Sequence, residues 1–561
     1  MQVQVSELIV KYMERLGITT IFGMPGAHIL PVYDSLYDSD IQSVLAKHEQ
    51  GAAFMACGYA RASGNISACI TTAGPGATNL VTGIANAYAD KQPILIITGE
   101  TPTYIFGKGG LQESSGEGGS INQSALFDSI TRYSRVIERT DYLPNVLNQA
   151  SKILLSDNAG PVLLSLPYNV QKEMIDLAIL DDIVCSRTPV STDSEPGPQT
   201  NRQVKRFVEL LRDSQKPVLV SGYGCIKSGA QSLVTELSQS LNIPVTSSLK
   251  GKGSINECSE LSLGSLGVTS SGYAFDYIVN HADLVIVLGA SFNERTSYLW
   301  NDKLLADKTV IQIDINDEQL NKVYQADLGI QADIKQTLQD ILHEIGQQPI
   351  DKKQSGNIIE FKNSFEERAN NNGDSIFQAE FSLVKSLFEK MNTQLPHEIT
   401  IFDDNIIFAQ NLLQVSTRNK FYPNAGVSSL GHAIPAAIGA QFFEQTTMFA
   451  IIGDGGFQMC CMEIMTAVNY DKPLNIILFN NSSMGLIRKN QVQSYENRFI
   501  DCDFINPDYK KLADSFGINH HLIQDESDMR SLFADTDFET EINLIEIIID
   551  KNAFPNYSSR R

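Results

Sequence analysis

Short apolar runs alternate with amphipathic segments over almost the whole chain. Residues 66–72, 94–98, 284–289, 448–453 and 474–479 are runs rich in Ile, Val and Leu that end at Gly, Thr or Asn. Runs of this length predict strands buried on both faces, and the helical periods between them predict crossover helices. The pattern therefore predicts an α/β protein built from doubly wound parallel sheets.

Two polar stretches divide this pattern into three parts. Residues 172–200 contain a Ser- and Pro-rich segment, and residues 347–373 are rich in Lys, Asn and Gln. Such compositions are typical of interdomain linkers. We expect an N-terminal domain at 1–180, a central domain at 195–345 and a C-terminal domain at 370–561, because 561 residues allow three or four domains.

Composition narrows the class of protein. The chain has 65 Asp and Glu against 43 Lys and Arg, a formal net charge of −22, which argues against nucleic acid as a partner. No basic and apolar leader opens the sequence, and no apolar run approaches the length of a membrane span. The eight cysteines form no C-x-x-C pair and predict reduced structural thiols. We expect a cytoplasmic protein without membrane contact.

The ends of two neighbouring strands carry hard metal ligands. Gly453-Asp454-Gly455 follows one apolar run, and Asn480-Asn481 follows the next. Because the carboxyl ends of neighbouring parallel strands share one crevice, Asp454 and Asn481 are expected to meet there. Their oxygens suit Mg²⁺, and the glycines let backbone N–H groups approach a diphosphate. The stretch predicts a metal and diphosphate site, whereas a lone Gly-Asp-Gly would indicate only a tight turn.

Three motifs of the predicted N-terminal domain complete a known constellation. They are Gly23-x-Pro25-Gly26, His48-Glu49-x-x-Ala52-Ala53 and Thr72-x-Gly74-Pro75-Gly76-x-x-Asn79. Alone, Glu49 would be a first-turn glutamate that favours the helix dipole. In this order, and with Asn480-Asn481 at its spacing from the Gly-Asp-Gly, the motifs resemble the thiamine-diphosphate superfamily of acetolactate synthases, pyruvate decarboxylases and benzaldehyde lyases. The resemblance extends to about Gly517.

The resemblance implies thiamine diphosphate and Mg²⁺ as cofactors. Glu49 would share a proton with the aminopyrimidine ring of the cofactor, and exclusion of water should raise the pKa of Glu49. Leu430 would hold the cofactor in a bent shape, and the carbonyl of Ser428 would accept from its amino group. The implied metal ligands are Asp454, Asn481 and the backbone oxygen of Ser483. The other implied cofactor contacts are Pro25, Gly26, Thr72, Asn79, Gly453, Gly455, Gly456, Met484, Gly485, Leu486 and Ile487.

The expected substrate residues depart in part from the acetolactate synthase pattern. His28 resembles the benzaldehyde lyases, where a histidine works on the substrate hydroxyl, but it is equally a helix-start residue bonded to the backbone. Gln112 is a candidate catalytic residue or a plain loop residue, and Arg132 steers a carboxylate or is a surface cation. A Trp that lines the acceptor pocket in the synthases is Asn490 here. The substrate pocket predicted in this way contains Ala27, Leu111, Arg132, Ile487 and Asn490.

The central domain raises the question of a flavin. Strand-to-loop signals at 217–224, 284–289 and 310–315 predict a Rossmann-like sheet. Gly222-x-Gly224 lacks the rest of the dinucleotide fingerprint, and the segment from Gly289 to Arg295 only partly resembles the FAD-binding phrase of the synthases. FAD is therefore an alternative that we do not favour.

The resemblance implies a decarboxylating carboligase that joins a pyruvate-type 2-oxo acid, after loss of CO₂, to a second carbonyl compound. The alternatives are an acyloin lyase or carboligase of the benzaldehyde lyase type, a simple 2-oxo acid decarboxylase, and, more remotely, a non-catalytic cofactor-binding subunit. The superfamily places the catalytic glutamate of one subunit against the diphosphate site of another. We therefore expect a homodimer as the minimum unit, a homotetramer as the favoured assembly, and small 2-oxo acids or aldehydes as substrates.

Overall fold

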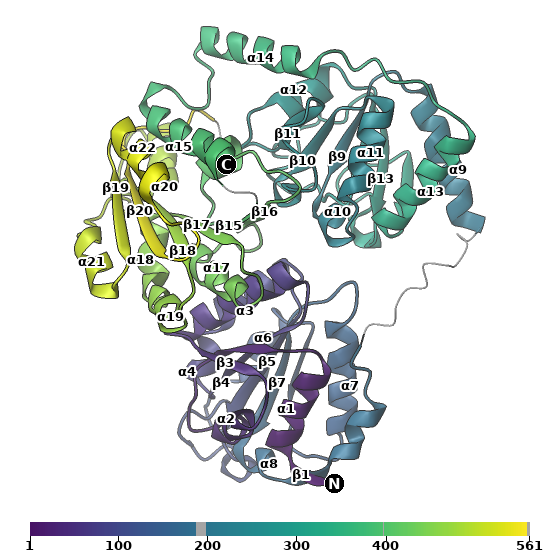
Figure 1. Ribbon diagram of the computed structural model, residues 1–561. Helices are drawn as coiled ribbons and strands as arrows, with labels where there is room; N and C mark the ends of the chain where they lie inside the picture. The colour runs from purple at the N-terminus through teal and green to yellow at the C-terminus, as the bar shows by residue number, and fades with distance from the viewer. Residues whose placement is uncertain (187–197, 396–397, 558–561) are drawn as a thin grey trace.

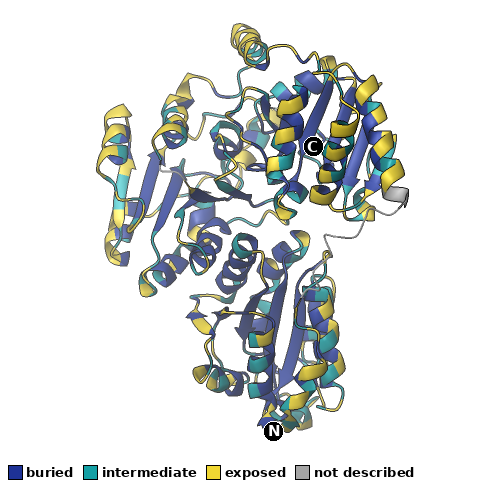
Figure 2. Ribbon diagram, turned by 45° about the vertical axis from the view of Figure 1, so that its right-hand side comes forward, coloured by how far each residue is buried: buried dark blue, intermediate teal, exposed yellow. Residues whose placement is uncertain are grey.

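The computed structural model describes residues 1–186, 198–395 and 398–557, which form three domains (Figure 1). Each domain is built around a six-stranded sheet whose strands all run parallel and whose faces are covered by helices. Most strands are buried, while most helices expose their outer faces (Figure 2). The predicted α/β fold with three doubly wound sheets is confirmed.

The N-terminal sheet has the strand order β3-β2-β4-β5-β7-β6. Its strands are β2 (Thr20–Gly23), β3 (Gln42–Leu45), β4 (Ser67–Thr71), β5 (Ile94–Glu100), β6 (Tyr133–Val136) and β7 (Val162–Pro167). Its helices are α1 (Val5–Arg15), α2 (Leu30–Tyr37), α3 (Glu49–Ser63), α4 (Pro75–Thr78), α5 (Val81–Ala89), α6 (Gln123–Asp128), α7 (Leu143–Leu154) and α8 (Tyr168–Gln171). A two-stranded antiparallel ribbon joins β1 (Gln2–Gln4) to β8 (Met174–Asp176). The predicted first linker therefore begins as part of this domain, and most of its Ser- and Pro-rich segment lies outside the described residues.

The central sheet has the order β11-β10-β9-β12-β13-β14, which is the 3-2-1-4-5-6 order of the Rossmann fold. Its strands are β9 (Pro217–Ser221), β10 (Val245–Ser248), β11 (Ser262–Leu266), β12 (Leu284–Leu288), β13 (Thr309–Asp314) and β14 (Leu328–Gln331). Its helices are α9 (Pro198–Asp213), α10 (Tyr223–Lys227), α11 (Gln231–Leu241), α12 (Tyr273–Asn280) and α13 (Ile334–Gln347). The predicted second linker contains a further helix, α14 (Ile358–Asn372), because Asn357 caps its start with two hydrogen bonds and Gly373 ends it at φ 72°.

The C-terminal sheet has the order β16-β15-β17-β18-β20-β19, so its strands follow the chain in the same relative order as those of the N-terminal sheet. Its strands are β15 (Ile399–Asp403), β16 (Lys420–Pro423), β17 (Thr447–Gly453), β18 (Leu474–Asn480), β19 (Asn519–Ile523) and β20 (Ile542–Ile548). Its helices are α15 (Ser382–Gln394), α16 (Ile407–Leu412), α17 (Ala433–Gln441), α18 (Asp454–Cys460), α19 (Ile464–Asn469), α20 (Gly485–Ser494), α21 (Tyr509–Phe516) and α22 (Glu526–Asp535). The helix expected between β17 and β18 is thus two short helices joined by a 3₁₀ turn.

Helices α3 and α17 pack against each other where the N-terminal and C-terminal domains meet (Figure 1). All nine residues of α17 are buried, because the helix is apolar on every side. A Cβ atom on Gly58 of α3 would collide with the carbonyl oxygen of Ala436, and one on Gly439 would collide with the carbonyl of Met55. The two glycines allow the backbones of α3 and α17 to touch, which fixes how the two domains pack against each other.

Within the described parts of the chain, none of the helices combines the length and the apolarity that a bilayer crossing requires.

Candidate active site

The C-terminal half of the candidate site forms where β17 and β18 end side by side. The two strands pair in parallel, with Gly453 opposite Phe479, so the next residues of both strands reach the same edge of the sheet. Asp454 is the first residue of α18. Its Oδ2 atom accepts the backbone N–H of Asn481 at 3.1 Å and that of Ser482 at 2.6 Å, and its Oδ1 atom accepts the N–H of Gly455 at 2.9 Å. The structure therefore brings Asp454 and Asn481 together, as the strand order predicts.

The surroundings of Asp454 fit a cation and a phosphate group. Asp454 is 2% exposed, and burial raises the pKa of its carboxyl, whereas hydrogen bonds from Asn506 and from backbone N–H groups oppose this rise. A Cβ atom on Gly455 would lie 2.6 Å from the sulfur of Met484, and one on Gly456 would lie 2.5 Å from Oδ2 of Asp404. The absence of side chains at Gly455 and Gly456 lets a ligand approach the backbone closely, which is what phosphate binding requires.

The N-terminal half of the candidate site is centred on Glu49, the first residue of α3. The side chain of His48 caps this helix by accepting the N–H of Gln50 at 3.2 Å. Asn79, which ends α4, donates its amide to Oε2 of Glu49 at 2.9 Å. Glu49 thus has one oxygen held by the protein and the other free to meet a ligand.

Three further predicted residues lie together at the same edge of the N-terminal sheet. Oε1 of Gln112 lies 3.3 Å from Nδ1 of His28 and 3.3 Å from the hydroxyl of Thr72. Gln112 has a φ of 58°, a left-handed conformation that its loop must hold in place. The carboxylate of Glu113 does this, because it accepts backbone N–H groups of the loop at 2.6 to 3.0 Å. The donors are Gly107, Gly109 and Gly110. Sequence reasoning missed Glu113, although a carboxylate beside a glycine-rich loop is the signal that could have found it.

The segment that carries Ser428 and Leu430 is held from inside the C-terminal domain. Asp404 is 2% exposed and accepts the backbone N–H of Gly431 at 2.7 Å and that of His432 at 3.1 Å, together with the amide of Asn424 at 3.2 Å. Burial raises the pKa of Asp404 to about 6. The side chain of Asp404 therefore positions the segment that carries Ser428 and Leu430.

Comparison with known proteins identifies the family of all three domains. Residues 3–120 match the N-terminal TPP binding domain of the thiamine pyrophosphate enzymes, residues 204–341 match their central domain, and residues 405–546 match their C-terminal TPP binding domain. The chain belongs to the thiamine pyrophosphate enzyme family. The two TPP binding domains support thiamine diphosphate as the cofactor; Glu49 lies in the first matched domain and Asp454 in the third.

Proteins similar to this chain include acetolactate synthases. A probable acetolactate synthase large subunit of Methanocaldococcus jannaschii is 33% identical over 97% of this chain and 92% of its own. The acetolactate synthase isozyme 2 large subunit of Escherichia coli is 30% identical over 92% of this chain and 90% of its own. The acetolactate synthase large subunit of Lactococcus lactis is 31% identical over 98% of this chain and 92% of its own. This member of the family is acetolactate synthase-like along nearly its full length.

The predicted substrate residues do not all gather at one place in the single chain. Leu111 is 76% exposed at the carboxyl edge of the N-terminal sheet, where Ala27 is also exposed. Arg132 lies at the opposite, amino edge of the same sheet, since it directly precedes β6; its guanidinium stacks 5.2 Å from the ring of Tyr88 and donates to Asn158 at 3.3 Å. Within one chain, Arg132 is therefore separated from the other predicted substrate residues.

A small cavity beside α20 adds a cation that sequence reasoning did not assign to the substrate. The cavity has a volume of about 180 Å³ and is lined by Leu486 and Asn490 of α20, by Arg295 of the central domain and by Tyr557. The guanidinium of Arg295 donates to Gln410 at 3.4 Å and to Asn405 at 3.3 Å, which fixes its position. The sequence signal that could have pointed to Arg295 is its place in the loop after β12, a strand of the central domain.

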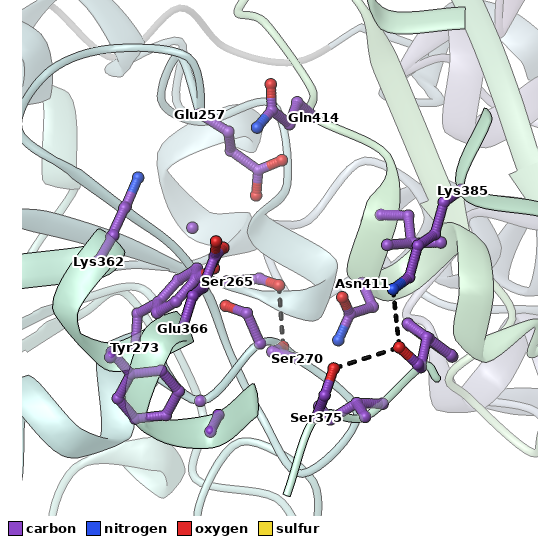
Figure 3. Close-up of a pocket in the computed structure, with 18 of the residues that line it drawn as sticks. Glu257, Ser265, Ser270, Tyr273, Lys362, Glu366, Ser375, Lys385, Asn411 and Gln414 are labelled. Carbon is purple, nitrogen blue, oxygen red and sulfur yellow. Dashed lines mark hydrogen bonds between the residues drawn. The ribbon is translucent and has the colours of Figure 1, made fainter. Parts of the chain in front are cut away.

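A larger cavity of about 910 Å³ lies between the central and C-terminal domains (Figure 3). Lys362 and Glu366 of α14 form one wall, and Lys385 of α15 forms the other (Figure 3). Lys385 donates to the carbonyl of Phe377 at 2.7 Å. The lining of this cavity contains both acidic and basic side chains, so the cavity has no single preference for the charge of a ligand.

Proposed function

We propose that this protein is a thiamine-diphosphate-dependent carboligase that forms acetolactate or a closely related 2-hydroxy-3-oxo acid from 2-oxo acids. The observation that carries this proposal is the presence, in one acetolactate synthase-like chain, of the Asp454 and Asn481 crevice and of the Glu49 and Asn79 pair. The crevice of Asp454 and Asn481 suits a metal diphosphate, and the pair of Glu49 and Asn79 suits proton exchange with a heterocycle.

Mg²⁺ would be held by the carboxylate of Asp454, the side-chain oxygen of Asn481 and the backbone oxygen of Ser483. Oxygen ligands of this kind suit Mg²⁺, which keeps further positions for phosphate oxygens and water. The amide oxygen of Asn481 already accepts the backbone N–H of Ser483 at 3.2 Å, so the loop that would supply these ligands is preorganised. The N–H groups of Gly455 and Gly456 would face the diphosphate.

Thiamine diphosphate, when bound, supplies the carbanion and the electron sink for breaking and forming bonds next to a carbonyl group. Glu49 would hold and exchange a proton at the ring nitrogen of the aminopyrimidine. Because Oε2 of Glu49 is engaged by Asn79 at 2.9 Å, Oε1 is the atom that would make this contact. His28 and Gln112 would donate hydrogen bonds to the substrate oxygen that gains negative charge.

The cavity beside α20 would receive the second carbonyl compound. Its volume of about 180 Å³ suits an acceptor of a few carbon atoms, and the guanidinium of Arg295 suits the carboxylate of a 2-oxo acid. Ile487 is 48% exposed on the same helix and would line the entrance. A 2-oxo acid is therefore favoured over an uncharged aldehyde as acceptor.

An acyloin lyase or carboligase is the second candidate. It is favoured by one observation, the contact of 3.3 Å between Nδ1 of His28 and Oε1 of Gln112, because such a pair can take a proton from a substrate hydroxyl. The simple decarboxylase has no comparable support from the described side chains.

FAD is not favoured, but the central domain has room beside the expected thiamine site. A cavity of about 510 Å³ is lined by Tyr223, Lys250, Gly289, Arg295 and Ser428. Purified protein that is colourless, and that releases no flavin on denaturation, would agree with our preference; a yellow protein would contradict it.

The assembly that we propose is a homodimer as the minimum active unit, with a homotetramer favoured. Glu49 is partly exposed in the single chain, and the exposed Leu111 lies at the same edge of its sheet. A second chain that covers this edge with its own Asp454 crevice would complete the site. The relatives are named large subunits, so a smaller regulatory subunit is a further partner to test.

The test is to incubate the purified protein with thiamine diphosphate, Mg²⁺ and a panel of 2-oxo acids, aldehydes and acyloins, and to identify the products by mass spectrometry. Acetolactate from pyruvate alone is the expected result. Cleavage of acyloins without release of CO₂ would support the lyase, and a free aldehyde as the main product would support the decarboxylase. No turnover of any 2-oxo acid or acyloin would contradict the proposal.

A further inference from the structure

A line of hydrogen-bonded side chains connects Asp454 with the far edge of the C-terminal sheet. The line runs from Asp454 through Asn506, Asn480 and Glu546 to His520 on the edge strand β19. We call Asn506, Asn480 and Glu546 the amide relay. None of these three residues belongs to the metal or diphosphate contacts described above.

Each contact in this line is short. The amide nitrogen of Asn506 lies 2.8 Å from Oδ2 of Asp454 and 2.7 Å from Oδ1 of Asn480. The amide nitrogen of Asn480 lies 2.6 Å from Oε1 of Glu546, and Oε2 of Glu546 lies 2.8 Å from Nε2 of His520. The side chains of His520 and Glu546 are each 9% exposed, so the outer end of the line is also shielded from water.

The direction of these hydrogen bonds follows from the carboxylate of Glu546. An ionised carboxylate only accepts hydrogen bonds, so Asn480 must turn its NH₂ group toward Glu546 and its oxygen toward Asn506. Asn506 must then turn its own NH₂ group toward Asn480 and Asp454. Gln458 of α18 fixes the same orientation, because its amide donates to Oδ1 of Asn506 at 2.7 Å. The carboxylate of Glu546 thus determines, through Asn480, that Asn506 turns its NH₂ group toward Asp454.

We infer that the amide relay positions Asp454 for the metal of the cofactor, with Asn506 as the residue that acts directly on the carboxylate. This inference rests on the proposed function, because it takes Asp454 as a metal ligand. A donor on one side of a ligating carboxylate fixes its rotation and its charge, and loss of such outer contacts typically weakens metal binding 10- to 100-fold. Asn506 and Glu546 are positioning residues in this scheme.

The test measures Mn²⁺ binding by electron paramagnetic resonance in the full-length protein saturated with thiamine diphosphate. Asn506→Ala should weaken the affinity for Mn²⁺ at least about ten-fold. Glu546→Gln keeps the volume of the side chain but allows the amide of Asn480 to turn over. It should weaken the affinity for Mn²⁺ about three-fold or more, which is less than the loss expected in Asn506→Ala.

Asn543→Ala is the matched control. Asn543 is a buried amide on the same strand as Glu546 and donates to Asn475 at 2.9 Å and to Asp537 at 2.8 Å, without a link to Asp454. Its replacement should lower the melting temperature but leave the affinity of the folded protein for Mn²⁺ within about two-fold of the wild type. A merely structural role for Asn506 would make the two alanine variants alike.

The outcomes separate the relay from the proposed function. Wild-type protein that binds Mn²⁺ together with an Asn506→Ala variant of unchanged affinity would overturn the relay alone. If Asn506→Ala does not fold, Glu546→Gln decides in the same way: an unchanged affinity overturns the relay and a loss supports it. Wild-type protein that does not bind Mn²⁺ in the presence of thiamine diphosphate would overturn the metal site and the relay with it.

Discussion

Glu49 and Asp454 are both the first residues of helices that follow a parallel strand, yet their surroundings suit different tasks. Asp454 is buried, and both of its oxygens accept hydrogen bonds, which keeps it in place for a cation. Glu49 is partly exposed, and among the described residues it is Asn79 that holds one of its oxygens, which would leave the other for proton exchange. The difference lies in the number of donors around each carboxylate.

Replacement of Glu49 by Gln should lower the turnover number about 10²- to 10⁴-fold, because the amide keeps the shape of the side chain but cannot exchange the proton. Binding of thiamine diphosphate should remain, since the diphosphate contacts lie in the other half-site. Steady-state turnover and isothermal titration with the cofactor check the two statements.

The control for this variant is Glu7→Gln. Glu7 is also a glutamate in the first turn of a helix, α1, but it lies outside the candidate site. Its replacement removes only a helix-dipole contribution, worth a few tenths of a kcal/mol. Equal turnover of Glu49→Gln and wild type would refute the assigned role.

A buried carboxyl in the C-terminal domain should make stability depend on pH. Asp403 is fully buried, and burial raises its pKa to about 7. A raised pKa means that the folded state favours the protonated form. The contribution of Asp403 to the free energy of unfolding is therefore complete below the ordinary pKa of 3.8, and it is lost as the pH rises through about 7. The loss is on the order of a few kcal/mol.

Calorimetric melting temperatures at pH 5 and pH 8 test this expectation. The wild type should melt at a lower temperature at pH 8, and the difference should shrink in Asp403→Asn, which cannot ionise. Asp403 accepts the amide of Gln410 at 2.9 Å and the N–H of Ile406 at 2.8 Å, so Asn loses one of these contacts and should cost stability at pH 5. An identical pH dependence in both proteins would contradict the argument.

At the scale of elements, the contact between α3 and α17 sets how the N-terminal and C-terminal domains meet. His432, just before α17, packs edge-on against Phe54 of α3 with ring centroids 5.1 Å apart. Lys47 and His48, at the start of α3, donate backbone N–H groups to the carboxylate of Glu463 at 2.9 to 3.2 Å. The helix that presents Glu49 is therefore held by the domain that contains Asp454.

Replacement of Gly58 by Ala should destabilise the protein, because the new Cβ atom would collide with the backbone of Ala436 and one of the two helices must move. The expected cost is about 1–3 kcal/mol, measured as a lower melting temperature. Gly346→Ala is the matched control: this helical glycine has nothing within 4 Å of an added Cβ, so the change should be neutral or stabilise by up to about 1 kcal/mol. Equal effects of both variants would contradict the close packing.

At the scale of the whole molecule, several apolar side chains near the half-sites are left exposed by the single chain. Ile505 is 95% exposed beside Asn506, Ile500 is 70% exposed, and Leu111 is 76% exposed near Gln112. Exposed apolar groups of this kind are typical of protein–protein interfaces, and the second chain that we propose would cover them.

Light scattering coupled to gel filtration should therefore give a mass of at least two chains, and turnover per chain should fall on dilution as dimers dissociate. Ile505→Asp should shift the protein toward monomers and lower its turnover. Tyr37→Asp is the control, because Tyr37 is 90% exposed at the end of α2. A fully active monomer would refute the shared site.

The sequence by itself determined the sheets, because buried strands leave continuous apolar runs, and it determined the cofactor family, because its motifs are local in the chain. It predicted that Asp454 and Asn481 meet, since parallel neighbours must end at one edge. Only the tertiary structure showed the amide relay, the place of Arg295 and the helix in the second linker. These features depend on side chains from separate segments and on caps, which periodicity does not record. The roles of the site residues and the domain boundaries stay predictions.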